Sequence, residues 1–127
     1  MDSLSNAIIT MMNNELRNKR SCVVSPASKL IGQVLRALQQ NGYVGAFEFI
    51  DDGRSGKFVI QLLGRINGVG PIRPRFPVNA RKLEIWERRY LPGRELGYLI
   101  LSTSRGIMTN RAAKAQHLGG TLLAYVY

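Results

Sequence analysis

Two stretches in the first third of the chain place hydrophobic residues three and four positions apart, as in an amphipathic helix. The first covers residues 4–16, and Asp2 or Ser3 is suited to cap its N-terminus. The second covers residues 30–38. We therefore expect two helices that each bury one face.

Strands are predicted where β-branched and aromatic residues gather, at residues 22–25, 43–50 and 58–63. Ser25-Pro26 has the form of a helix cap followed by proline at the first helical position, so we expect the second helix to begin there. Asn41-Gly42 is a typical helix stop. The first half of the chain is thus predicted to be a mixed unit of helices and strands.

After Gly64 the pattern changes to short apolar runs that glycine and proline interrupt. Residues 81–90 have helical spacing, with Trp86 expected in a packing role, and residues 97–101 form an apolar strand. Thr109 is a plausible cap for a short helix that follows it, and a Gly-Gly turn precedes a final strand.

These elements predict an α+β protein made of two small lobes. Residues 1–64 are expected to form an N-terminal lobe with the order helix, strand, helix, strand, strand. Residues 65–127 are expected to form a mostly β lobe with short helices.

The charge is large and unevenly spread. The net charge is +10 and the sequence pI is about 10.5. Residues 1–64 carry seven Lys/Arg and five Asp/Glu, whereas residues 65–127 carry eleven and three. A balance of this kind favours a polyanionic partner, usually nucleic acid, and places its contact surface mainly in the C-terminal half.

Several other classes of protein are disfavoured. Cys22 is the only cysteine, so an internal disulfide is impossible, and its apolar neighbours suggest a small buried residue. No run approaches the roughly 18 apolar residues of a membrane span, and the N-terminus lacks the basic region of a secretory signal. We expect a soluble, cytoplasmic protein without a cofactor.

The segment with the most distinctive chemistry is Ser102-Thr103-Ser104-Arg105-Gly106. Three hydroxyls leave the end of an apolar strand, and each is able to donate to a phosphate or a ribose 2′-OH and to accept from a base amino group. Arg105 offers a planar fork that suits phosphate, and Gly106 permits close approach or a positive φ. A plain Ser/Thr-rich turn is the alternative interpretation.

A second candidate site is Ser28-Lys29, at the start of the second helix. Free backbone N–H groups and the helix dipole attract anions there, and Lys29 adds a full charge. A solvated lysine is the alternative. Arg65, with Arg73 and Arg75, places further cations in the glycine- and proline-rich stretch, and we include Arg65 among the expected RNA contacts.

Catalytic and metal-binding interpretations are weak. His117 is the only histidine, so a serine nucleophile has one possible general base, and no cysteine or second histidine could join His117 on a metal. Asp51-Asp52 lies in a glycine turn and is expected to shape that turn. A DNA-binding regulator that uses residues 30–38 for recognition stays open as an alternative function, and a serine hydrolase as a remote one.

Taken together, the motifs resemble the small-subunit ribosomal protein eight family, in its archaeal branch. The resemblance covers the whole chain. It rests on residues 102–109 with Ala113 and Gly119-Gly120, and on Pro26 to Leu30, Phe49 to Gly53 and Leu63 to Asn67. Pro74 to Pro77 and Trp86 to Pro92 resemble the archaeal and eukaryotic branch, and within it Met108-Thr109 and Leu122 to Tyr127 resemble archaeal members most.

The resemblance implies a structural protein that binds a central-domain hairpin of small-subunit rRNA and lies beside other ribosomal proteins. Carried over by position, residues 102–106 are the primary RNA contacts, and Gly119 and Gly120 let a neighbouring turn approach the RNA. Ser28-Lys29 meets phosphates. The family commonly has glycine where this chain has His117, so a different local turn is expected.

Overall fold

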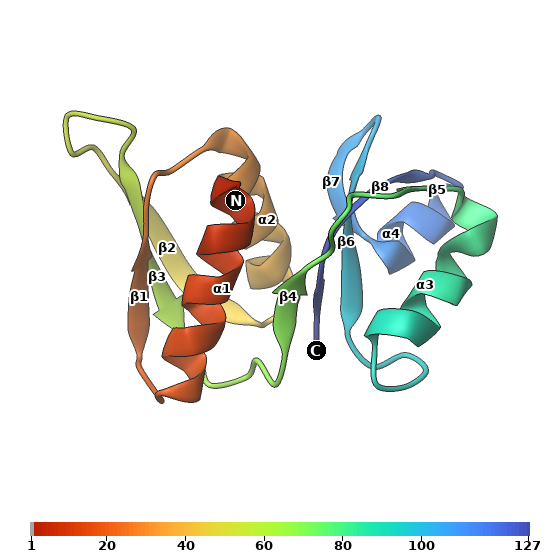
Figure 1. Ribbon diagram of the computed structural model, residues 1–127, viewed down its shortest axis with the longest axis horizontal. Coiled ribbons are helices and arrows are strands. Elements are labelled where there is room, and N and C mark those ends of the chain that lie inside the picture. Colours follow the sequence, from red (N-terminus) through yellow and green to blue (C-terminus); the bar gives the residue numbers. More distant parts are fainter. Residues whose placement is uncertain (1) are drawn as a thin grey trace. The chain divides into compact units, whose positions relative to one another are not determined.

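The computed structural model describes residues 2–127, which divide into two compact units (Figure 1). The first unit ends at Ile66, and the second unit comprises Asn67–Tyr127. Helices and antiparallel sheets occur together, which confirms the predicted α+β class.

The first unit packs two helices against a three-stranded sheet (Figure 1). Its elements, in chain order, are α1 Ser3–Leu16, β1 Ser21–Val24, α2 Lys29–Gln40, β2 Val44–Ile50 and β3 Lys57–Leu62. The antiparallel strands follow the order β1-β3-β2, and buried residues alternate with more exposed ones along β1 and β3. One face of the sheet is therefore covered by helices. The centre of this core includes Ile8, Met11, Ile31, Leu35, Leu38 and Ile60.

Both helices of the first unit begin at a side-chain cap. The Asp2 carboxylate accepts a hydrogen bond from the Ser5 N–H at 2.8 Å, and the Ser28 hydroxyl accepts one from the Ile31 N–H at 3.2 Å. Such caps satisfy backbone donors that the first helical turn leaves without partners.

The prediction that Ser25-Pro26 begins the second helix was wrong. The helix begins at Lys29, and the peptide bond between Ser25 and Pro26 is cis. The Ala27 N–H donates to the Gly56 carbonyl at 2.9 Å, so this segment is tied to the β2–β3 connection instead of entering the helix. Ser28 has the same capping chemistry as Ser25 and lies where the helix starts.

The second unit is built on a five-stranded antiparallel sheet. The path is β4-β8-β6-β7, and β5 also pairs with β8 beyond the end of β4. The bounds are β4 Val69–Pro71, β5 Pro77–Val78, η1 Ala80–Lys82, α3 Leu83–Tyr90, β6 Tyr98–Thr103, β7 Gly106–Thr109, α4 Asn110–Ala115 and β8 Gly120–Val126.

Two strands differ from the sequence prediction. Strand β6 continues through Thr103, two residues beyond its predicted end, and β7 was not predicted. The hydroxyl residues and Gly106 suggested an irregular loop, but they form the tip of a hairpin whose strands pair from Ile100↔Thr109 to Thr103↔Gly106. Cross-strand pairing supplies the regular structure that local composition concealed.

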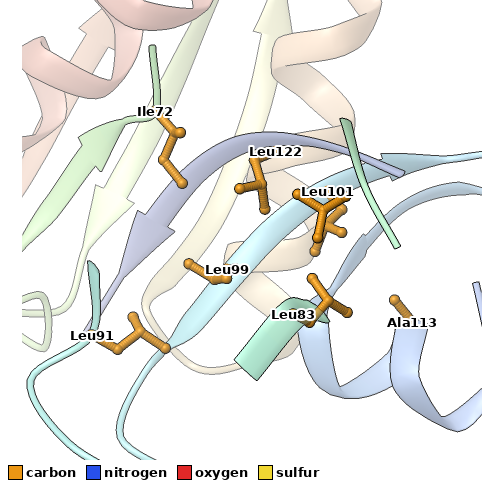
Figure 2. Packing of buried hydrophobic residues seen from close by; sticks show 8 residues of the cluster. Ile72, Leu83, Leu91, Leu99, Leu101, Ala113 and Leu122 are labelled. Atoms are coloured by element: carbon orange, nitrogen blue, oxygen red, sulfur yellow. The ribbon is translucent and has the colours of Figure 1, made fainter. Parts of the chain in front are cut away.

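The core of the second unit lies between the sheet and its helices. Figure 2 shows side chains from β6 and β8 pointing toward residues of α3 and α4. The cluster consists of Ile72, Val78, Leu83, Leu91, Leu99, Leu101, Ala113 and Leu122. A column of aromatic rings, with centroids 4.7 to 6.4 Å apart, packs against it and comprises Phe76, Trp86, Tyr90, Tyr125 and Tyr127. Trp86 thus has the packing role that the sequence suggested.

Cys22 is buried on β1, as predicted. Burial, together with the nearby Glu15 carboxylate, raises the pKa of its thiol from 9.0 to about 11. The thiol is therefore neutral at physiological pH and a poor nucleophile. Among residues 2–127, no helix is long and apolar enough to cross a bilayer.

The turn between β2 and β3 is shaped by its two aspartates, as expected. The Asp51 carboxylate accepts from the Gly53 N–H at 2.9 Å, and the Asp52 carboxylate accepts from the Arg54 and Gly56 N–H groups at 3.0 Å. These backbone hydrogen bonds lower the pKa of Asp52.

Helix α4 ends in a left-handed residue that is not glycine. His117 has φ 55°, its N–H donates to the Lys114 carbonyl at 3.1 Å, and the Leu118 N–H donates to the Ala113 carbonyl at 2.9 Å. This pair of hydrogen bonds is the Schellman motif, in which the left-handed position usually holds glycine. The backbone thus keeps the turn that glycine favours, and His117 adopts the positive φ at a cost in conformational free energy.

We expect His117→Gly to stabilise the protein by roughly 0.5–1 kcal/mol, because glycine adopts a positive φ without steric strain. Chemical denaturation of both proteins measures the difference. The control is Ala115→Gly, inside the same helix, which should destabilise by a similar amount. A His117→Gly variant less stable than the parent would mean that the imidazole itself stabilises the turn.

Candidate nucleic-acid interface

The hydroxyl segment forms the tip of the β6–β7 hairpin. Thr103 and Gly106 are directly paired, so Ser104 and Arg105 make a two-residue turn, and both are exposed. The Thr103 hydroxyl donates to the Gly106 carbonyl at 2.8 Å and accepts from the Arg105 N–H at 3.1 Å. The Thr103 side chain therefore closes the turn and holds its neighbours in place.

Gly106 is needed for the backbone conformation of this tip. Its φ is 111°, a value that residues with a Cβ adopt only under strain. Apart from its neighbours in the chain, no described residue has an atom within 4 Å of a Cβ at this position. The space beside Gly106 is consequently open to a ligand.

Ser102 faces away from the core cluster. It pairs with Thr121 on β8 and with Ile107 on β7, whereas the preceding residue, Leu101, pairs with Leu122 in the core. Because successive side chains on a strand alternate between faces, the hydroxyls of Ser102 and Thr121 share the face opposite that core.

Three polar side chains of this tip are unengaged. Within residues 2–127, the side chains of Ser102, Ser104 and Arg105 make no hydrogen bond, and Arg105 makes no ion pair. Two hydroxyls and one guanidinium are thus available on a short, rigid hairpin. Thr103, by contrast, has its hydroxyl proton committed to Gly106.

Gly119 and Gly120 are explained by packing within the protein. A Cβ on Gly119 would lie 2.5 Å from the Val78 carbonyl oxygen, and one on Gly120 would overlap the Ser102 carbonyl oxygen. These glycines let β8 lie against β5 and β6. The expected role of admitting RNA to this turn is therefore not needed to explain them.

The candidate residues of the first unit lie at opposite ends of α2. Ser28 caps the helix, and Lys29 is its exposed first residue. The Arg65 guanidinium donates to the Gly42 carbonyl at 3.4 Å, just after the helix ends. Twelve helical residues span about 18 Å, so Arg65 does not join Ser28 and Lys29 in one cluster.

All three carboxylate side chains of the second unit line one cleft of about 640 Å³. Lys114 pairs with Glu87 at 2.7 Å, and Arg88 pairs with Glu84 at 2.9 Å. We call it the mixed-charge cleft; its charged residues are Glu84, Glu87, Arg88, Arg94, Glu95, Arg111 and Lys114.

Side-chain hydrogen bonds fix the walls of the mixed-charge cleft. Asn110, which is 2% exposed, donates to Glu87 on α3 and accepts from the Leu99 N–H on β6 at 3.1 Å. The Arg111 guanidinium donates to the Glu95 carbonyl at 2.5 Å and lies over the Tyr98 ring. Of the cations in residues 96–127, Arg105 is therefore the one without a side-chain partner among the described residues.

A second cleft, of similar volume, contains no carboxylate. It lies where β5 pairs with β8, and its lining residues are Pro77, Val78, Asn79, Lys82, Trp86, Gly119, Gly120 and Thr121. We call it the acid-free cleft. Sequence reasoning missed it, because one wall comes from residues 77–86 and the other from residues 119–121, and only strand pairing brings them together.

The described residues offer no cluster of three His, Cys, Asp or Glu side chains that could hold a metal ion. His117, the one histidine, is exposed at the end of α4.

Replacing Thr103 with valine should loosen the hairpin tip, because valine keeps the shape but removes both hydrogen bonds of the hydroxyl. We expect a loss of about 1 kcal/mol in stability and faster hydrogen exchange at the Arg105 amide. Exchange measured by NMR tests this. Ser104→Ala is the matched control and should leave exchange at the Arg105 amide unchanged. If the valine variant exchanged this amide at the same rate as the parent protein, Thr103 would not be the residue that closes the turn.

Comparison with known proteins places this geometry in a family. The ribosomal protein S8 family matches residues 2–127. Small ribosomal subunit protein uS8 of Pyrobaculum islandicum is 54% identical over 127 residues, which cover 100% of this chain and 98% of that protein. The proteins of the same name from Pyrobaculum neutrophilum and Caldivirga maquilingensis are each 52% identical over the same spans. These relatives confirm the resemblance to the archaeal branch, and the chain belongs to the ribosomal protein S8 family.

Proposed function

We propose that this protein is a structural, non-enzymatic component of the small ribosomal subunit that binds its rRNA through the β6–β7 hairpin. The observation that carries this proposal is the exposed tip, where Ser102, Ser104 and Arg105 present polar groups that the protein itself leaves unengaged. Its relatives are named as proteins of the small ribosomal subunit, which supports the proposal.

The chemistry of the tip suits RNA. The minor groove of an RNA helix is wide and shallow and displays 2′-hydroxyls and base edges. Serine hydroxyls both donate to and accept from such groups, whereas a lysine-rich surface would only follow the phosphates. Arg105 supplies one charge-assisted contact to a phosphate.

The residues of the tip divide into contacting and positioning groups. Ser102, Ser104 and Arg105 contact the RNA. Thr103 and Gly106 hold the turn that presents them, through the hydrogen bonds of one and the positive φ of the other. A turn fixed before binding loses little conformational entropy on binding, so its contacts yield more affinity.

The neighbouring glycines and the first unit have supporting roles. Gly119 and Gly120 keep β8 close enough to β6 to support the tip. Ser28 and Lys29 form a separate phosphate contact at the start of α2. Arg65, whose guanidinium uses one nitrogen on the Gly42 carbonyl at 3.4 Å, keeps further donors for a phosphate and forms another contact of the first unit.

The finer assignment follows from the family resemblance. The RNA is a hairpin in the central domain of the small-subunit rRNA, bound early in assembly, and other proteins of the small subunit are neighbours. The excess of cations over carboxylates in residues 65–127 agrees with a polyanionic partner of this kind.

Ser104→Ala should weaken binding to a synthetic central-domain hairpin by about 1–3 kcal/mol, or roughly 5- to 150-fold, if the hydroxyl forms a hydrogen bond at a desolvated site. Filter binding measures the affinity. Ser55→Ala, an exposed serine in the β2–β3 turn, is the matched control and should bind like the parent. The proposal would be contradicted if the Ser104→Ala variant bound the RNA as tightly as the parent protein does. It would also be contradicted if duplex DNA competed for the protein as well as the RNA hairpin does.

Lys29→Gln tests the phosphate contact of the first unit. We expect the plot of log affinity against log salt concentration to become shallower by about one phosphate contact. Lys19→Gln, an exposed lysine after the end of α1, should leave the slope unchanged. Identical slopes for the two variants would remove Lys29 from the interface.

A further inference from the structure

We propose that the acid-free cleft binds an unpaired nucleotide of the same RNA, so that the RNA surface continues from the hairpin tip across β8 to η1 and α3. This inference rests on the proposed function and adds a second subsite to it. Its polar side chains come from Asn79 and Lys82, Thr121 lies at its rim, and Trp86 forms part of the wall.

The cleft is continuous with the hairpin tip through the strand register. Thr121 pairs with Ser102, and Gly120 pairs with Thr103, while the other edge of β8 pairs with Pro77 and Val78 of the cleft. Neighbouring strands lie about 4.8 Å apart. Thr103 at the hairpin tip and Gly120 at the rim of the cleft therefore lie one strand spacing apart.

The cleft also offers polar groups that the protein does not use. Within the described residues, the Lys82 ammonium has no ion pair, and Asn79 precedes η1 without forming a side-chain cap. An ammonium and an amide together suit a phosphate and a base edge.

Trp86 supplies a wall and not a free stacking platform. Its ring is stacked on Phe76 with a centroid separation of 4.7 Å, and the Arg89 guanidinium lies 5.4 Å from its centroid. The volume of about 640 Å³ lies within the roughly 300–1,000 Å³ of small-molecule sites. A nucleotide is thus held by the polar groups and by contact with the indole edge.

The distribution of charge selects this cleft over the other one. The second unit has three carboxylate side chains, and all of them line the mixed-charge cleft. There, Glu84 and Glu87 already pair with Arg88 and Lys114 and compete with a phosphate for these cations, whereas Lys82 in the acid-free cleft has no carboxylate beside it. Since both clefts have similar volumes, charge and continuity with the hairpin tip distinguish them.

The natural protein carries its own reporter, because Trp86 is the only tryptophan. Trp86 fluorescence is excited at the long-wavelength edge of tryptophan absorption. Saturating the protein with the synthetic central-domain RNA hairpin should quench this fluorescence or shift its emission maximum. Lys82→Gln should weaken hairpin binding several-fold and make the salt dependence shallower by about one phosphate contact. Arg94→Gln, which removes a cation from the mixed-charge cleft, is the matched control and should leave the slope unchanged.

The outcomes separate this inference from the proposed function. Suppose that the protein binds the RNA hairpin but that Trp86 emission does not change, or that the salt dependence of binding is the same for Lys82→Gln and the parent. Either result would overturn the nucleotide subsite and leave the tip of the β6–β7 hairpin as the RNA contact. A response of Trp86 to poly-glutamate but not to RNA would make the occupant an acidic protein segment and overturn it too. Failure of the parent protein to bind the hairpin would overturn both. A thermal melt of each variant checks that the fold is intact.

Discussion

The pairing of β8 with three other strands is the constraint on which the second unit depends. β4 and β5 pair with one edge of β8 at successive positions, and β6 pairs with the other. This pairing sets Thr121 beside Ser102, brings residues 77–78 next to Gly120, and buries Leu122 against Leu101. The candidate interface is therefore a product of long-range hydrogen bonding.

Two steric requirements make that pairing possible at the end where the interface lies. Gly120 leaves room for the Ser102 carbonyl, and Gly119 leaves room for the Val78 carbonyl. At the tip itself, the double hydrogen bond of Thr103 closes the turn that presents Ser104 and Arg105. Residues that a sequence motif groups together as contacts thus perform different tasks, since some shape the surface and others are free to bind.

Features governed by local chemistry could be predicted from the sequence. Helical spacing located α1 and α2, and Thr109 caps α4 by accepting from the Ala112 N–H, as its position suggested. Cys22 is buried, and the two aspartates of the β2–β3 turn bind its backbone. The cap and the turn depend on residues within a few positions of one another, and the burial of Cys22 was indicated by its apolar neighbours in the chain.

Features governed by distant residues could not be predicted. β7 has little strand character of its own, and pairing with β6 establishes it. Ser25 and Ser28 are both competent caps, and the hydrogen bond from Ala27 to Gly56, far along the chain, decides between them. The acid-free cleft and the gathering of three glutamates in the other cleft likewise appear only after folding.

Hydrogen–deuterium exchange of the protein with and without small-subunit rRNA tests the central claim most directly, namely that the RNA lies on the β6–β7 hairpin. The account predicts protection of residues 102–106 upon RNA binding, with residues 92–97 of the mixed-charge cleft unchanged. Protection confined to residues 92–97, with the hairpin tip exchanging as in the free protein, would contradict it.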